Sequence, residues 1–208
     1  ALYGATWLSS HDVFVSEMLL IEIYFICFEH IFKRAQPWSV MSSYNKVNGT
    51  YTSQSKALLT DILRDELNFE GLVMTDWFGG EDATAQINAG NDLIEPGTKK
   101  QWDALLEANA EGSLEEPIID RAAARILKAI FQSRKMQAYT PNNTPDLKAH
   151  ALLTRKAAAD GMVLLKNNGT LPLKKEKNIA LFGNTSYGFI AGGTGSGDVN
   201  EAYTVSLE

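Results

Sequence analysis

The sequence predicts an α/β protein made of parallel strand–helix units, and two observations support this class. Short apolar runs alternate with segments whose apolar residues recur at helical spacing. Turn-forming or acidic residues close each run, as expected for strands that lie between helices. Three such units are too few for a closed barrel of about 250 residues. Residues 1–135 are therefore expected to form the C-terminal part of a (β/α)8 TIM-like barrel.

The elements follow one another in a regular order, and prolines and glycines mark their ends. Pro37 ends the first helix because proline disfavours helical backbone in the residue before it. Gly90 ends the short third helix, and Pro96 closes the third strand. The pattern predicts helices over residues 16–35, 53–67, 81–89, 101–111 and 115–133, and strands over residues 38–44, 71–76 and 92–96.

A second region follows a break in the pattern. Residues 136–147 are polar and contain two prolines, which predicts a linker. Beyond it, a helix is expected over residues 148–166, a strand over residues 178–182 and a glycine-rich loop over residues 192–197. Residues 148–208 are therefore expected to form the N-terminal part of a second α/β domain.

Composition narrows the classes of function. The 208 residues are 45% apolar, which is ordinary for a globular protein. A net charge of −6 with only 19 basic residues argues against a nucleic acid partner. The single Cys27 cannot form an intrachain disulfide, and the three histidines are scattered without metal-ligand spacing. We therefore expect no metal site.

One segment, residues 13–32, has the apolar content of a membrane span. Three acids, Glu17, Glu22 and Glu29, interrupt it, and a charge within lipid is costly. The sequence therefore favours a buried helix of a larger assembly over a membrane helix. The chain also lacks a starting Met and a targeting signal, and it is expected to be a piece of a longer protein.

The most informative stretch is an apolar strand that runs directly into Asp76 and Trp77. In a parallel barrel the carboxyl ends of the strands carry the active site. A carboxylate there can act as a nucleophile on a sugar, and an indole beside it offers a flat apolar wall for a ring-shaped ligand. The alternative is that Asp76 caps the helix that follows.

Other polar residues lie at the ends of the neighbouring strands. Tyr44 could donate a hydrogen bond that orients Asp76, or it could be a core ring with a satisfied hydroxyl. Asp92 and Glu95 are more readily explained as structural residues, because Pro96 closes the turn there. The glycine-rich loop lacks the last glycine of the dinucleotide-binding pattern, so a substrate-contacting loop is favoured over a nucleotide site.

Taken together, these residues resemble glycoside hydrolase family 3, the β-glucosidase family. The similarity extends over nearly all of the chain, and the Met-Thr-Asp-Trp context that ends at Trp77 is its most specific part. The matching runs are residues 38–49, 59–64, 69–77, 89–97, 161–168 and 171–173.

The resemblance implies a site and an activity. Asp76 would be the catalytic nucleophile, Trp77, Met41 and Tyr44 would line the sugar subsite, and the second domain, an α/β sandwich, would lend Ser196. The implied reaction is retaining, exo-acting hydrolysis of a β-linked glucoside or oligosaccharide through a glycosyl–Asp intermediate, without a cofactor. A secreted or periplasmic location is implied as well.

The chain also departs from the family. The Lys-His pair that grips sugar hydroxyls would precede Ala1, and the general acid/base Glu would lie beyond Glu208. We therefore expect weak or no activity from these 208 residues alone. Two partners are left open, namely the missing remainder of the longer protein and a second copy of this chain. The alternatives are a non-catalytic carbohydrate-binding remnant that keeps Trp77 and Tyr44, and a nucleotide-binding α/β domain.

Overall fold

The computed structural model describes residues 11–174, 178–188, 197–198 and 200. The chain divides into two compact units, one ending at Tyr139 and the other beginning at Thr140.

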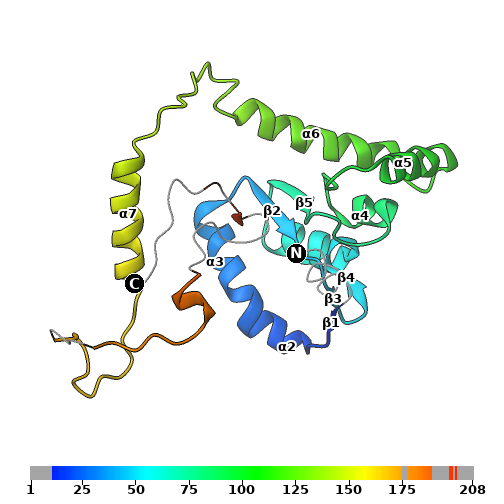
Figure 1. Ribbon diagram of the computed structural model, residues 1–208. Helices are drawn as coiled ribbons and strands as arrows, with labels where there is room; N and C mark the ends of the chain where they lie inside the picture. The colour runs from blue at the N-terminus through cyan, green and yellow to red at the C-terminus, as the bar shows by residue number, and fades with distance from the viewer. Residues whose placement is uncertain (1–10, 175–177, 189–196, 199, 201–208) are drawn as a thin grey trace. The chain divides into compact units, whose positions relative to one another are not determined.

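A pair of parallel strands forms the centre of the first unit (Figure 1). β2 (Ser39–Ser42) lies beside β5 (Leu72–Thr75), and the register pairs Ser39 with Leu72 and Ser42 with Thr75. Gly71 precedes β5 at a point where a Cβ atom would lie 2.6 Å from the carbonyl oxygen of Trp38, so this close approach requires glycine. The parallel pair confirms the α/β class.

The third predicted strand, residues 92–96, is reduced to one bridge. Leu93 pairs with Met74 in parallel, on the far side of β5 from β2. The amides of Asp92 and Leu93 both donate to the carbonyl oxygen of Val73, at 2.8 and 3.2 Å. Because two successive amides share one acceptor, the regular ladder does not continue, and the prediction of a full strand is wrong.

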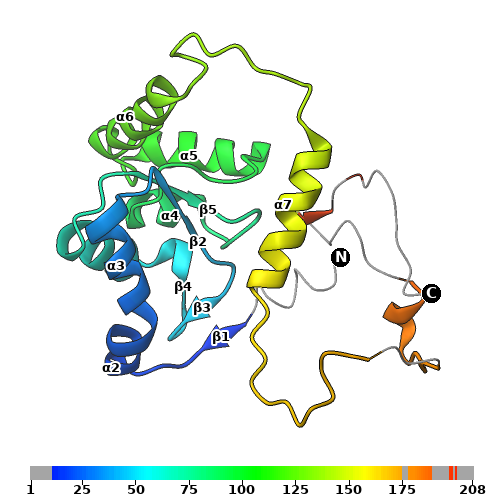
Figure 2. The same ribbon diagram turned by 90° about the vertical axis from the view of Figure 1, so that its left-hand side faces the viewer.

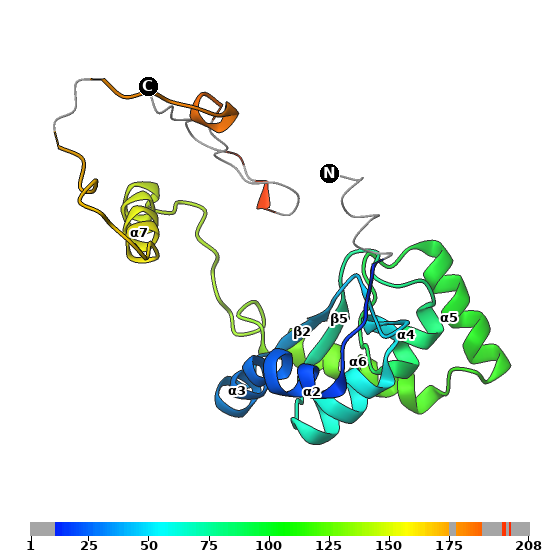
Figure 3. The same cartoon turned by 90° about the horizontal axis from the view of Figure 1, so that it is seen from below.

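Helices pack around the strand pair (Figures 1 and 3). α3 (Phe25–Ala35) and α4 (Ala83–Ala89) both contribute to the apolar cluster around Val73 of β5, and α5 (Lys99–Glu111) and α6 (Glu116–Gln132) follow α4 along the chain. Two apolar clusters fill the contacts. The first comprises Phe32, Leu59, Leu63, Phe69, Val73 and Ala89, and the second comprises Ala83, Ile87, Ile94, Ala108 and Leu114.

The helices that follow β5 begin and end where their sequence provides caps. The Asp82 side chain accepts from the Ala85 amide at the start of α4. Thr98 and Gln101 form a reciprocal capping box at the start of α5, which ends at Gly112 in a left-handed conformation. These helix predictions are confirmed to within two residues at most boundaries.

A second, small sheet fixes the segment that follows β2. β1 (Asp12–Val13) pairs in parallel with β3 (Lys46–Val47), which pairs in antiparallel fashion with β4 (Thr50–Tyr51). A turn at Asn48-Gly49 joins β3 to β4. Asn48 also accepts from the Val15 amide at 3.0 Å, so the hairpin is tied to the N-terminal segment.

Two predicted helices form, and each contains a π-helical segment, whose turns are wider than α-helical ones. The helix predicted over residues 16–35 consists of α2 (Glu17–Leu19), the π-helical η1 (Leu20–Tyr24) and α3. The helix predicted over residues 53–67 consists of the 3₁₀ turn η2 (Thr52–Gln54) and the π-helix η3 (Ala57–Glu66). Within the described part of the chain, no helix is both long and apolar enough to cross a membrane.

The second unit contains less regular structure than the sequence predicts. α7 (Leu147–Asp160), labelled in Figure 2, ends before Gly161, so residues 162–166 of the predicted helix are not helical. Residues 178–182 do not form the predicted strand, and the 3₁₀ turn η4 (Asn184–Ser186) follows them. A strand needs a partner for its amides and carbonyls, and no described residue pairs with this run.

A buried charge cluster joins the elements of the first unit. Asp92, whose side chain is 1% exposed, binds Arg64 of η3 at 2.8 Å and Arg125 of α6 at 2.9 Å. The Val73 amide also donates to Asp92, at 2.9 Å, and Arg64 donates to the carbonyl oxygens of Phe69 and Gly71. Burial, followed by repulsion from Arg125, lowers the pKa of Arg64 to about 10, so Arg64 is still protonated near neutral pH. Asp92 is therefore a structural residue.

The cluster gives a stability prediction. Replacing Asp92 with Asn leaves Arg64 and Arg125 without a counter-charge, which should lower the free energy of unfolding by about 3–5 kcal/mol. All four tryptophans precede Tyr139, so urea unfolding followed by tryptophan fluorescence reports on the first unit. The matched control is Asp103→Asn, which breaks the exposed Lys99–Asp103 pair and should cost less than about 0.5 kcal/mol. An Asp92→Asn effect as small as the control's would contradict this role.

Candidate active site

Asp76 lies directly after β5, where the backbone turns sharply. Its amide donates to the carbonyl oxygen of Ser42 at 3.1 Å, and its own carbonyl oxygen accepts from the Gly79 amide at 2.9 Å. The amide of Trp77 donates to Asp76 Oδ1 at 2.6 Å, which fixes the carboxylate against the turn. The side chain remains half-buried, so it is oriented by the backbone and still reachable from solvent.

The alternative that Asp76 caps the following helix is wrong. α4 begins after Asp82, and the Asp82 carboxylate accepts the capping hydrogen bond from Ala85 at 2.9 Å. With another acid in that position, the carboxylate of Asp76 is not used to start a helix.

The environments of Asp76 and Asp92 differ in the features that decide reactivity. Asp92 is buried and held by two arginines, whereas Asp76 forms no ion pair with any described residue. A carboxylate locked between two guanidinium groups cannot approach a substrate. A half-exposed carboxylate held only by hydrogen bonds can.

Tyr44 supplies the side-chain partner of Asp76. It follows β2, the strand paired with β5, and its ring is half-buried. Loss of hydration raises the pKa of Tyr44 most, followed by a side-chain hydrogen bond to Asp76 and the negative charge of that carboxylate. The phenol is therefore neutral at physiological pH and can donate a hydrogen bond to Asp76.

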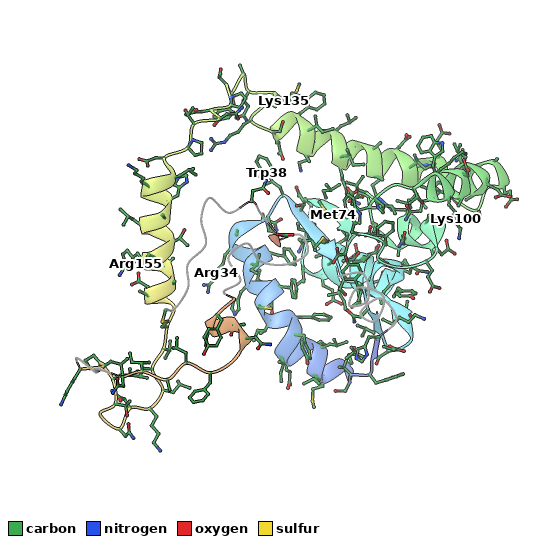
Figure 4. The ribbon with its side chains drawn as sticks, viewed as in Figure 1. Arg34, Trp38, Met74, Lys100, Lys135 and Arg155 are labelled. Atoms are coloured by element: carbon green, nitrogen blue, oxygen red, sulfur yellow. The ribbon has the colours of Figure 1, made fainter. Side chains whose placement is uncertain are left out.

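The predicted sugar-binding residues differ in how exposed they are and in which part of the chain carries them. Trp77 is 54% exposed beside Asp76, so its indole is open to a ligand. Met41 lies on β2 opposite Met74, which Figure 4 labels on β5, and it lines an apolar cavity with Phe28 and Leu58. Ser196 lies outside the described residues. The structure thus brings Asp76, Trp77 and Tyr44 together, and the roles of these three residues, like those of Met41 and Ser196, remain predictions.

A buried polar network supports the turn that carries Asp76. The side-chain amide of Gln86 donates to the carbonyl oxygen of Gly79 at 2.5 Å, and the side-chain amide of Asn91 donates to the carbonyl oxygen of Ser53 at 2.5 Å. Ser42 in turn donates to Asn91 at 3.3 Å. Sequence reasoning missed these residues, because a polar residue in a short helix or turn gives no sign that it is fully buried.

The same turn contains an unusual aromatic residue. Phe78 has a φ of 65°, in the left-handed region, where a non-glycine residue costs about 1–2 kcal/mol. Its amide donates to the carbonyl oxygen of Glu95 at 3.1 Å, and the Glu95 amide donates to Thr75 Oγ1 at 2.8 Å. The backbone of Glu95 thus holds both sides of the turn, in keeping with its predicted structural role.

Among the residues that the structure describes, no group of three or more His, Cys, Asp or Glu side chains could hold a metal ion. The chemistry that the described site itself offers is therefore that of a carboxylate, a phenol and an exposed indole.

Fold and site together define an α/β protein with an acidic site at the carboxyl ends of parallel strands. Residues 10–129 match the N-terminal domain of glycosyl hydrolase family 3, and residues 162–208 match the C-terminal domain of the same family. The chain therefore belongs to glycosyl hydrolase family 3.

Relatives of known name support the same assignment. Thermostable beta-glucosidase B of Acetivibrio thermocellus is 44% identical over 83% of this chain, and the match covers 23% of that protein. An exo-alpha-(1->6)-L-arabinopyranosidase of Bifidobacterium breve is 40% identical over 78% of the chain, and 21% of that protein is covered.

Solved structures share the fold. Beta-glucosidase 3B from Thermotoga neapolitana, solved with α-D-glucose, superimposes with a TM-score of 0.84 at 43% identity. That match covers 95% of this chain and 29% of the other. The present chain thus spans about a quarter of the length of the relatives it matches.

The raised pKa of Tyr44 gives a titration prediction. In a spectrophotometric difference titration of wild type against Tyr44→Phe, the missing phenol should ionise above its ordinary value of 10.0. Asp76→Asn should lower the pKa of Tyr44 without returning it to 10.0, because loss of hydration is the largest cause of the raised pKa and is still present in this variant. Since the folded state holds this proton more tightly, the stabilising contribution is complete below pH 10.0 and is lost as pH rises through the raised pKa.

Tyr51 is the matched control for this titration. Its pKa is also raised, by loss of hydration and by its hydrogen bond to Glu81, so Asp76→Asn should leave it unchanged. The account of Tyr44 is wrong if its phenol ionises at or below 10.0 in the wild type, or if Asp76→Asn shifts both tyrosines equally.

Proposed function

We propose that this chain carries the nucleophile of a retaining, exo-acting β-glycoside hydrolase, and that Asp76 is that nucleophile. The observation that supports the proposal is a half-exposed carboxylate at the end of β5 that has no cationic partner among the described residues. A backbone amide and a neutral phenol hold it, so it is oriented without being neutralised by a salt bridge.

In the proposed reaction, an Asp76 oxygen attacks the anomeric carbon of the non-reducing sugar. The bond from this carbon to the leaving-group oxygen breaks, and that oxygen takes a proton from a general acid. Water then attacks the same carbon and gives a proton to the conjugate base of that acid, while the bond from the carbon to the Asp76 oxygen breaks, which frees the sugar and restores the Asp76 carboxylate. Tyr44 donates to the carboxylate, Trp77 stacks on the sugar, and Met41 and Ser196 complete the subsite.

The architecture proposed for this function is the C-terminal part of a (β/α)8 barrel in residues 1–135, a linker in residues 136–147, and the start of an α/β sandwich in residues 148–208. The two matched family domains and the division of the chain near Tyr139 support this arrangement. In this arrangement the carboxyl ends of the barrel strands form the floor of the pocket. Tyr44 follows β2 and Asp76 follows β5, so both residues would lie there.

The proposed substrate is a pyranoside with a free non-reducing end, and a β-linked glucoside is the first choice. Relatives with β-glucosidase names favour glucose, and the arabinopyranosidase shows that the family's preferences reach beyond it. Retention requires a second carboxyl group about 5 Å from the first. Among the residues that the structure describes, none is identified as a partner acid for Asp76, and we propose that the 208 residues alone turn over substrate weakly or not at all.

Covalent trapping tests the nucleophile without the missing acid. A 2-deoxy-2-fluoro-β-glucoside with a dinitrophenolate leaving group needs no proton from a general acid, and its fluorine slows hydrolysis of the intermediate. We expect incubation to add one fluoroglucosyl group, which peptide mass spectrometry should locate on Asp76. Asp76→Asn should abolish the label, whereas the exposed control Asp103→Asn should retain it.

The outcomes separate the proposed function from its rivals. A label on another carboxylate, or a label that survives Asp76→Asn, would overturn the role of Asp76. Reversible glucoside binding without any label would favour a carbohydrate-binding remnant. Tight nucleotide binding lost on Gly195→Ala would favour a nucleotide-binding domain.

A further inference from the structure

The turn after Asp76 holds two neighbouring aromatic side chains that are both open to solvent. Trp77 is 54% exposed and Phe78 is 59% exposed. Their ring centroids lie 6.5 Å apart and their planes meet at 83°, so the rings are in edge-to-face contact. The two rings therefore form an aromatic corner on the segment that carries the carboxylate.

Phe78 occupies a backbone conformation that its residue type disfavours. The non-glycine residues with positive φ that the structure describes are Gln36, Asn48, Asn68, Phe78 and Ala138, and Phe78 is the one aromatic among them. Asparagine tolerates this conformation because its short side chain bonds locally. A bulky ring does not have this advantage.

Space in the turn does not explain why a phenylalanine is present. At Gly80, the second residue along, an added Cβ would collide with the side chains of Gln86 and Ser53, so a glycine is required there. Phe78 faces no such crowding, since most of its surface is exposed. The turn thus places a large side chain where Gly or Asn would be less strained, and little of that side chain is buried in return.

What the Phe78 ring does contact is the Trp77 indole, at nearly a right angle. An exposed indole without neighbours would sample several rotamers, each of which loses entropy when a ligand fixes it. A ring packed at a right angle limits that freedom before any ligand arrives. Strained residues that persist in a fold concentrate at functional sites, which fits this arrangement.

We propose that Phe78 is a positioning residue that holds the Trp77 indole in one orientation beside Asp76. The functional meaning of this inference rests on the proposed function, in which Trp77 stacks on the sugar that Asp76 attacks. Phe78 itself need not touch the substrate. Its backbone strain is the consequence of presenting an aromatic ring to Trp77 from the adjacent position.

Replacing Phe78 tests the inference through the stability of the fold and the spectroscopic signals of Trp77. Loss of a residue that only packs would not leave the stability unchanged while altering these signals. The Phe78→Asn variant should have an unchanged or higher urea midpoint, because the left-handed strain is relieved. The near-ultraviolet circular dichroism of Trp77, taken as the difference from a Trp77→Phe counterpart, should be lost. Acrylamide quenching of Trp77 fluorescence should increase.

Three further variants make the test specific. Phe78→Tyr keeps the aromatic edge and should keep the Trp77 signal, whereas Phe78→Leu is bulky without an aromatic ring and should lose it. Phe14→Asn removes another exposed phenylalanine, 80% exposed, and should leave Trp77 unchanged. The inference is overturned if Phe78→Asn lowers the midpoint or if Phe78→Leu retains the full Trp77 signal.

Labelling of Asp76 adds a functional readout. With the fluoroglucoside described above, Phe78→Asn should slow labelling about tenfold, because a misplaced binding group loses part of the advantage of orientation. Phe78→Tyr should restore the rate. Failure of the wild type to label would count against the proposed function, whereas the spectroscopic results would still decide the role of Phe78. Equal labelling rates in all Phe78 variants would overturn the positioning role.

Discussion

The arrangement of the first unit depends on one buried acid. Asp92 accepts hydrogen bonds from Arg64, Arg125 and the Val73 amide, and so joins η3, α6 and β5 at a single side chain. Burial of a lone carboxylate would be strongly unfavourable, but two guanidinium groups and a backbone amide compensate for the lost hydration. Because β5 is fixed by this cluster, the residue at its end is held at a defined place on the sheet edge. The position of Asp76 thus follows from the burial of Asp92.

Two acids close to β5, Asp76 and Asp92, have opposite roles because their surroundings differ. Asp92 is enclosed by cations and packed helices, which makes it a fixed point of the fold. Asp76 is held by the Trp77 amide and the Tyr44 phenol, and it remains half-exposed. The buried side-chain amides of Gln86 and Asn91 support the turn that follows Asp76. The strained Phe78 lies on that turn. The buried polar side chains are therefore structural, and the carboxylate of the candidate nucleophile remains accessible to solvent.

The strength of each sequence signal decided how well it predicted the structure. The apolar run before Asp76 and the spacing of Leu59 and Leu63 are consequences of burial, so the strand β5 and the helix η3 were predictable. The strand over residues 92–96 was not, because its bonding depends on two amides that share the Val73 carbonyl oxygen. The strand over residues 178–182 was wrong because a strand forms only with a partner, and propensity cannot supply one. The left-handed Phe78 was invisible, since a phenylalanine gives no sign of positive φ.

The central claim is that the carboxylate of Asp76 forms a covalent bond with a sugar, and a crystal structure tests it most directly. Crystals of the chain soaked with the activated 2-fluoroglucoside should show continuous electron density from an Asp76 carboxylate oxygen to the anomeric carbon, with the sugar ring lying on the face of Trp77. A sugar bonded to a different residue would contradict the account. So would a sugar bound beside Trp77 with Asp76 unmodified.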